Sequence, residues 1–190
     1  MRPLVYDTGP LRVVFYATMA VWVVRETVLQ QRAPGGGRDP SYYAMIVGSA
    51  GGVGLAILFA SVHDRLPGPR WVPAVLGVAL MWTGFVLRAW AIRALGRFFT
   101  VTVGVEEGHT VVDTGPYSHI RHPSYTGMLL FFVGLGIALD SWLSLAAATL
   151  LSLAGMVIRI AYEEKVLRRE LGDPYISYSK RTSRLIPKLW

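Results

Sequence analysis

Five long apolar segments dominate this chain and restrict it to very few folds. They cover residues 11–30, 41–62, 72–94, 124–139 and 141–158. A bilayer core about 30 Å thick is crossed by roughly 20 apolar residues in a helix, and the first three segments reach that length. The last two are slightly shorter and meet at Asp140 and Ser141, which predicts a tight helical hairpin. We therefore expect an all-α integral membrane protein with about five transmembrane helices.

The composition agrees with a membrane protein rather than a soluble one. Hydrophobic residues make up 53% of the 190 residues and charged residues only 16%, against about 25% charged in a soluble domain. The net charge is +7, but the basic residues lie between and after the apolar segments instead of forming one block. This distribution indicates membrane topology and not nucleic-acid binding. The length predicts one integrated domain.

Several kinds of site are excluded or not expected. The chain has no cysteine, which excludes disulfides, Cys-bound zinc, iron–sulfur clusters and thiol catalysis. Its four histidines, His63, His109, His119 and His122, are too scattered to predict a metal site. No cleavable signal peptide is evident, because polar residues and Pro10 interrupt the N-terminus before an apolar core begins. The first apolar segment is therefore expected to remain as a membrane span.

Gly48 and Gly52 stand one helical turn apart inside the second apolar segment, in the stretch GSAGGVG. The stretch resembles a scrambled nucleotide-binding loop, but it follows no strand and lies inside an apolar run. Small residues at this spacing let two membrane helices approach closely. The two glycines therefore predict a helix-packing face.

The basic residues also predict an orientation in the membrane. Five spans place the two ends of the chain on opposite sides of the bilayer. The side that holds the C-terminus also receives the segments 31–40 and 95–123 and most of the arginines and lysines. Positive charge favours the cytoplasmic side. We expect a cytoplasmic C-terminus, in the cell membrane of a prokaryote or the endoplasmic reticulum of a eukaryote.

Arg159 and Glu163 share one face of a helix at the end of the fifth apolar segment. An exposed ion pair is the simpler explanation for the two residues alone. However, Arg159 directly follows an uncharged apolar run, and ionisable groups at that depth usually face a cavity or the bundle interior. A guanidinium there can bind a carboxylate or a phosphate, and a carboxylate one turn further out can hold a cation.

Four separated elements of the C-terminal half, taken in order, resemble the isoprenylcysteine carboxyl methyltransferase family, which belongs to a wider group that includes phospholipid methyltransferases. The first two elements are His-x-x-Val before a tyrosine and Arg-His-Pro-x-Tyr-x-Gly, both within HTVVDTGPYSHIRHPSYTG at residues 109–127. The third is Glu-Glu-x-x-Leu, within RIAYEEKVL, and the fourth is Gly-Asp-x-Tyr-x-x-Tyr, within LGDPYISYSKRTSRLIP. The resemblance covers about residues 95–190.

The resemblance implies a multi-span membrane enzyme that uses S-adenosylmethionine and releases S-adenosylhomocysteine, without a soluble Rossmann fold. It implies a cytoplasmic cofactor-binding region and assigns Arg159 and Glu163 as catalytic, with Arg159 facing the substrate. The implied cofactor residues are His109, Thr110, Val111, Val112, Tyr117, His122, Pro123, Ser124, Tyr125 and Glu163. Residues 1–94 would then form the acceptor side and residues 95–190 the catalytic region.

The acceptor stays open at this point. A carboxylate on a lipophilic or prenylated molecule is already ionised and needs only a cation such as Arg159 to position it. An amine, as in a phospholipid headgroup, must first lose a proton, for which Glu164 or His122 is available. A sterol-reductase-like membrane oxidoreductase and a non-catalytic membrane scaffold are two further hypotheses. Four aromatic residues could line a path for the lipid or could simply pack: Trp82, Phe85, Phe131 and Phe132.

Overall fold

The computed structural model describes residues 3–7, 9–31, 39–62, 64–104, 108 and 110–190. The main helices are α1 (Pro10–Gln31), α2 (Pro40–Phe59), α3 (Trp71–Leu95), α4 (Pro123–Ala138), α5 (Trp142–Leu171) and α6 (Asp173–Arg181). Short 3₁₀ turns are η1 (Leu4–Tyr6), η2 (Gly96–Phe98) and η3 (Gly115–Ser118). Over the described ranges, β pairing is limited to one isolated bridge between Ile120 and Ser183. The all-α prediction is confirmed.

Five of these helices correspond to the five apolar segments. By length and hydropathy, four of them can cross a membrane, namely α1, α2, the helix that begins at Trp71 and α5. The fifth, α4, is apolar but has only 16 residues, which is about 24 Å at 1.5 Å per residue. The chain therefore folds as an integral membrane protein whose fourth helix is shorter than the bilayer core.

The fifth helix is longer than the apolar pattern predicts. The apolar segment ends at residue 158, but α5 continues to Leu171. Its added turns consist largely of glutamate, lysine, arginine and leucine, which are good helix formers. The helix stops where Gly172 adopts a positive φ of 59° and Pro174 follows two residues later. Loss of apolarity marks where α5 leaves the membrane, not where it ends.

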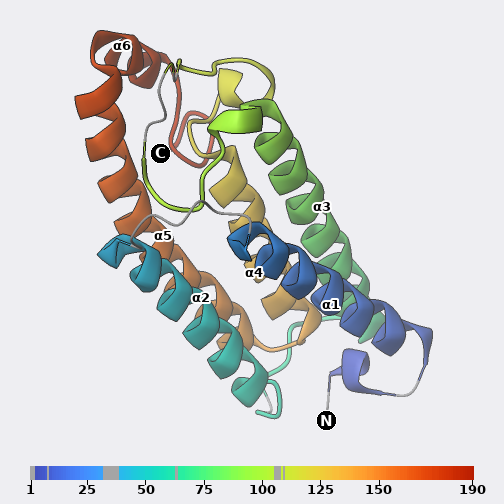
Figure 1. Cartoon of the computed structure of the whole chain (residues 1–190). Helices are drawn as coiled ribbons and strands as arrows, with labels where there is room; N and C mark the ends of the chain where they lie inside the picture. Colours follow the sequence, from blue (N-terminus) through green and yellow to red (C-terminus); the bar gives the residue numbers. More distant parts are fainter. Residues whose placement is uncertain (1–2, 8, 32–38, 63, 105–107, 109) are drawn as a thin grey trace.

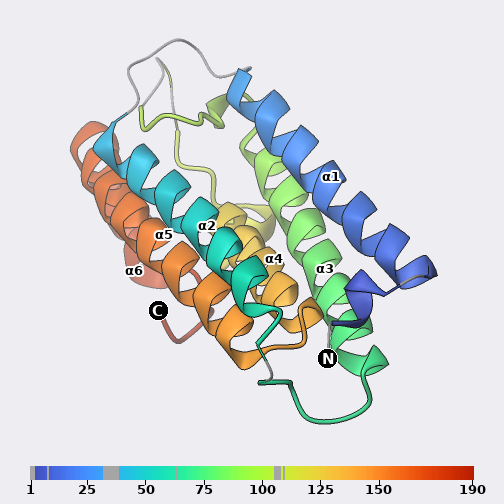
Figure 2. The same ribbon diagram turned by 90° about the horizontal axis from the view of Figure 1, so that it is seen from below.

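The helices pack as antiparallel neighbours, with α3 against α4, α2 against α5, and α4 against α5 (Figures 1 and 2). Helix α1 lies outside this group and contacts α3. The closest approaches use glycine: a Cβ on Gly134 would lie 2.6 Å from the carbonyl oxygen of Gly77, and one on Gly127 would lie 2.6 Å from that of Gly84. Both pairs join α3 to α4 backbone to backbone.

The predicted packing face on α2 is confirmed. A Cβ on Gly48 would lie 2.6 Å from the carbonyl oxygen of Leu151, and one on Gly52 would lie 3.0 Å from that of Ala147. Both neighbours belong to α5. Glycine therefore brings α2 and α5 together, as it does α3 and α4.

The aromatic residues considered for a lipid path pack mainly in the core. Phe131 and Phe132 are almost completely buried, and Trp22 of α1 stacks on Phe131 with 3.8 Å between ring centroids. Trp82 is 40% exposed, and its indole N–H donates to the hydroxyl of Thr18 at 3.0 Å. These contacts attach α1 to α3 and α4.

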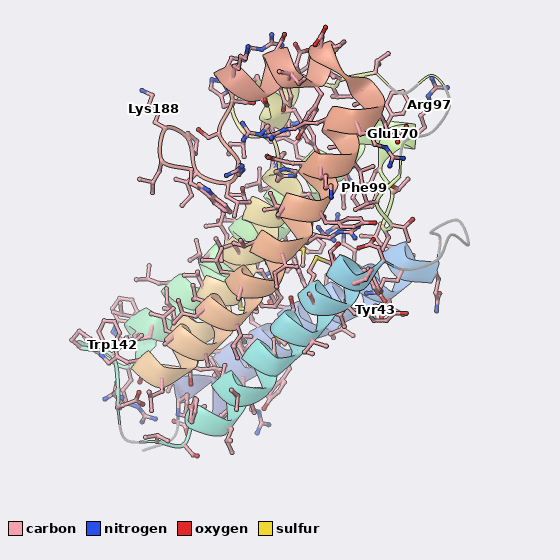
Figure 3. All side chains as sticks on the ribbon, turned by 90° about the vertical axis from the view of Figure 1, so that its left-hand side faces the viewer. Tyr43, Arg97, Phe99, Trp142, Glu170 and Lys188 are labelled. Carbon is pink, nitrogen blue, oxygen red and sulfur yellow. The ribbon has the colours of Figure 1, made fainter. Side chains whose placement is uncertain are left out.

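The predicted hairpin between α4 and α5 is also confirmed. Asp140 adopts a positive φ of 54° in the turn, and its buried carboxylate accepts a hydrogen bond from Arg65 at 2.6 Å. Asp64 accepts hydrogen bonds from the first backbone N–H groups of α5. Figure 3 shows Trp142 at this end of the bundle, while Arg97, Glu170 and Lys188 lie at the opposite end. The polar residues predicted to carry function gather at that opposite end.

Candidate active site

A cavity of about 1000 Å³, including the part open to solvent, lies at the end of the bundle where α3 ends and α4 begins. The predicted site residues that line it are Val111, Val112, Tyr117, His122, Ser124, Tyr125, Arg159 and Glu163. They come from the loop before α4, from α4 and from the part of α5 that extends past the start of α2 (Figure 1). Residues far apart in sequence therefore form one site.

Two predicted residues do not line the cavity, and a third is not among the described residues. Thr110 is exposed and does not line the cavity. Pro123 is buried at the first position of α4 and also does not line the cavity; its fixed φ suits a helix start. His109 lies outside the described residues.

The centre of the site is a hydrogen-bonded set formed by Glu163, Tyr125 and Arg159. The hydroxyl of Tyr125 donates to Glu163 at 2.7 Å and accepts from Nε of Arg159 at 3.3 Å. The Glu163 side chain is 26% exposed, whereas Arg159 is 2% exposed. One phenol thus connects a carboxylate that faces the cavity to a guanidinium buried one helical turn away.

Asp39 is the main site residue that the sequence did not reveal. It precedes α2, and its carboxylate accepts from Nη1 of Arg159 at 2.7 Å and caps α2 through the backbone N–H groups of Ser41 and Tyr42. Burial raises the pKa of Asp39, but hydrogen bonds from Ser41 and Arg159 outweigh this effect and hold its pKa below the ordinary value. Asp39 therefore stays ionised beside Arg159.

Arg159 has further partners. Its Nη1 also donates to the Ser41 hydroxyl at 3.1 Å, and its Nη2 donates to the carbonyl oxygen of Val101 at 2.7 Å. A guanidinium has five N–H groups, and the hydrogen bonds to Tyr125, Asp39, Ser41 and Val101 use four of them. The remaining Nη2 N–H belongs to a side chain that lines the cavity.

Glu164 has a different environment from its neighbour Glu163. It is 3% exposed, and it accepts from Arg121 at 2.9 Å, from Arg168 at 3.1 Å and from Arg184 at 3.2 Å. Nε2 of His122 lies 3.4 Å from it. Because three arginines neutralise this carboxylate, Glu164 is poorly suited to accept a proton from an amine.

A second ion pair joins the buried Arg88, which lines the cavity on the side of α3, to the half-buried Glu26 of α1. Nε and Nη2 of Arg88 donate to the two oxygens of Glu26 at 2.7 and 2.6 Å, and Nη1 donates to the hydroxyl of Ser124 at 2.5 Å. The pair joins α1 to α3 and α4. The pair was not predicted from the sequence, although an arginine and an acid at similar depths in two separate spans are the signal that would indicate it.

The segment after α6 returns and pairs with the residues before α4. The backbone N–H of Arg121 donates to the carbonyl oxygen of Ser183 at 2.7 Å, and that of His122 donates to Arg184 at 3.0 Å. The Tyr178 hydroxyl donates to the carbonyl oxygen of Tyr117 at 2.7 Å. The C-terminal segment thus holds the His-Pro stretch in place from outside.

Tyr175 of α6 offers an unused polar group to the cavity. The side chain is 4% exposed and lines the cavity, and its hydroxyl has no hydrogen-bond partner among the described residues. Burial raises the pKa of Tyr175 above its ordinary value, so the phenol stays protonated. A buried hydroxyl without a partner is costly, and a bound ligand with a polar atom would satisfy it.

The site therefore combines three kinds of contact around one cavity. Glu163 supplies a partly exposed carboxylate, Val111 and Val112 supply apolar surface, and Arg159 supplies a buried cation near the membrane. Such a cavity suits a ligand that is cationic and partly apolar, next to a second ligand that is anionic and lipophilic.

Residues 72–173 match a family model described as phospholipid methyltransferase. Among curated proteins, the chain is 34% identical over 120 residues to protein-S-isoprenylcysteine O-methyltransferase B of Arabidopsis thaliana, covering 62% of this chain and 61% of that protein. It is 33% identical over 134 residues to a probable protein-S-isoprenylcysteine O-methyltransferase of Oryza sativa subsp. indica, covering 70% of this chain and 68% of that protein.

The fold is also found in a solved structure. The eukaryotic intramembrane Ras methyltransferase ICMT matches over 97% of this chain and 70% of that protein, with a TM-score of 0.66 and 24% identity. At this identity the likeness concerns the fold. The chain spans about three fifths of the length of the Arabidopsis relative.

Proposed function

The chain belongs to the isoprenylcysteine carboxyl methyltransferase family, and from this premise we propose that it transfers a methyl group from S-adenosylmethionine to the carboxylate of a lipophilic, isoprenylcysteine-like acceptor. The observation that carries the proposal is the placement of Glu163 and Arg159 one helical turn apart, both in contact with the Tyr125 hydroxyl and both lining one cavity. The methyl donor would bind at Glu163 and the acceptor carboxylate at Arg159.

The described residues fit this donor. When bound, S-adenosylmethionine supplies an activated methyl group on a positively charged sulfur. Glu163 would hold the cationic part of the donor, and the unpaired hydroxyl of Tyr175 would donate to one of its polar atoms. Val111, Val112 and Tyr117 would provide apolar contact for its base. The protein's contribution is to bring the two reactants together in the right orientation.

The acceptor would be oriented rather than activated. A carboxylate is ionised at neutral pH and needs no general base, so the site requires only a cation that holds it against the donor. Arg159 lies where the apolar part of α5 ends. An acceptor with a lipid tail could therefore keep the tail in the membrane while its carboxylate reaches the guanidinium.

An amine acceptor is the second candidate, and the match to the phospholipid methyltransferase model is the observation that favours it. It would need a base in the site. Glu164 is occupied by Arg121, Arg168 and Arg184, and the buried His122 lies between Glu163 and Glu164. These contacts favour the carboxylate acceptor.

The test is a label-transfer assay with the purified full chain in lipid. Methyl-labelled S-adenosylmethionine would be supplied with N-acetyl-S-farnesylcysteine in one reaction and with phosphatidylethanolamine in another. We expect label in the farnesylcysteine that is released by base, because a methyl ester is base-labile. Base-stable label in phosphatidylethanolamine would support the amine acceptor. Absence of transfer to both, together with absence of S-adenosylhomocysteine binding, would refute the proposal.

A further inference from the structure

The proposed reaction removes charge, and this restricts how strongly Arg159 should hold the acceptor. An acceptor oxygen forms a bond to the methyl carbon while the carbon–sulfur bond of the donor breaks and its electron pair stays on sulfur. A carboxylate and a sulfonium thereby become a neutral ester and a neutral thioether, and no proton moves. A cation that stabilises the carboxylate fully would stabilise the ground state more than the transition state and so slow the reaction.

The structure places a counter-charge on Arg159. Asp39 contacts Nη1 of the guanidinium at 2.7 Å, and the Ser41 hydroxyl contacts the same nitrogen at 3.1 Å. Asp39 does not line the cavity, whereas Arg159 does. The carboxylate of Asp39 therefore leaves the cavity open for the acceptor.

We propose that Asp39 is a positioning residue that weakens the attraction between Arg159 and the acceptor carboxylate. The site then orients the carboxylate without holding it too tightly for methyl transfer. The proposal rests on the proposed function and deepens it. Asp39 fixes the guanidinium through Nη1 and leaves one Nη2 N–H for the acceptor. Its negative charge offsets part of the attraction that an unpaired arginine would exert on the incoming carboxylate.

The test substitution is Asp39→Asn, which removes the charge and keeps an oxygen to cap α2. We expect the KM for a farnesylcysteine acceptor to fall by about threefold to tenfold and kcat to fall by a similar factor, while the KM for the methyl donor is unchanged. Asp39→Ser, which also retains a capping oxygen, should give the same pattern. Asp7→Asn is the matched control, because it breaks the ion pair to Arg70 at the opposite end of the bundle.

A binding measurement without the donor separates this inference from the proposed function. We expect Asp39→Asn to bind the farnesylcysteine carboxylate more tightly than the wild type and to bind the corresponding methyl ester with unchanged affinity. A higher KM or weaker carboxylate binding in Asp39→Asn would overturn the inference, as would equal tightening for carboxylate and ester. If the wild type binds the carboxylate but never methylates it, the proposed function fails. The comparison of carboxylate binding between the wild type and Asp39→Asn still tests whether Asp39 weakens the attraction of Arg159.

Discussion

At the scale of single residues, Glu163 and Glu164 are adjacent in sequence but have different surroundings. Glu163 lines the cavity and contacts the Tyr125 hydroxyl, while Glu164 is enclosed by Arg121, His122 and two further arginines. Successive positions on a helix point about 100° apart, so one faces the cavity and the other faces the segment before α4. Neutralising Glu163 should therefore affect a different property of the protein from neutralising Glu164.

Glu163→Gln is expected to raise the KM for S-adenosylmethionine by tenfold or more, on the order of 1.4 kcal/mol, with little change in thermal stability. Glu164→Gln is expected to destabilise the fold by about 3 kcal/mol, because it leaves the buried Arg121 without a full counter-charge. Thermal unfolding in detergent and donor binding, measured on both variants, check this. Equal loss of donor affinity in both, with equal stability, would contradict the division of roles.

Some of these residues could be predicted from the sequence and others could not. Arg159 and Glu163 stand at helical spacing at the end of an apolar run, and that local pattern is sufficient to single them out. The contact of Asp39 with Arg159 spans 120 positions, and no local pattern indicates it. The pair of Arg88 and Glu26 spans 62 positions, but two opposite charges at matching depths in separate spans would have indicated it.

At the scale of the helices, close contact between α3 and α4 depends on glycine. A side chain at Gly134 would meet the backbone of Gly77 at 2.6 Å and of Met81 at 2.7 Å. These are main-chain atoms that cannot rotate away. By contrast, a Cβ on Gly54 of α2 would have no neighbour within 4 Å.

Gly134→Ala is expected to destabilise the protein by about 2 kcal/mol, because the added methyl group forces the two helices apart. Gly54→Ala is the control and should be neutral or stabilising by up to about 1 kcal/mol, since alanine favours a helix more than glycine does. Thermal unfolding in the same detergent measures both. If the two variants unfold at the same temperature, the close approach of α3 and α4 is not what stabilises the bundle.

Most bounds of the helices followed from apolarity, whereas their pairing, apart from the α4–α5 hairpin, did not. The predicted first and third segments, 11–30 and 72–94, lie one residue inside α1 and α3 at each end. The predicted end of the fifth segment at residue 158 fell short, because a helix continues beyond the membrane when its residues favour one. When a span is apolar on all sides, its sequence does not show which face contacts another helix. Only the glycines of α2 predicted a packing face.

At the scale of the whole molecule, the candidate site and the C-terminal segment share one end of the bundle (Figures 1 and 3). The positive charges of α5, α6 and the segment after them lie at this end, including Arg169, Lys180, Arg181 and Lys188. Basic residues favour the cytoplasmic side. We propose that the site opens to the cytoplasm.

This orientation can be tested with single cysteines, because the chain contains none of its own. Arg169→Cys places a thiol on an exposed turn of α5 at the site end, and Ser61→Cys places one after α2 at the opposite end. A membrane-impermeant maleimide added to intact cells should label Ser61→Cys and not Arg169→Cys. Labelling of Arg169→Cys and not of Ser61→Cys would show that the site faces the side opposite to the one proposed.

The unbroken course of α5 has a consequence for how lipid can enter. Arg159 and Glu163 lie on the same continuous helix, about 6 Å apart along its axis at 1.5 Å per residue. With the roles proposed above, the separation between acceptor and donor is set by covalent helix geometry. Neighbouring helices can shift sideways to admit a tail or release a product, and the distance that the methyl group must cross stays the same.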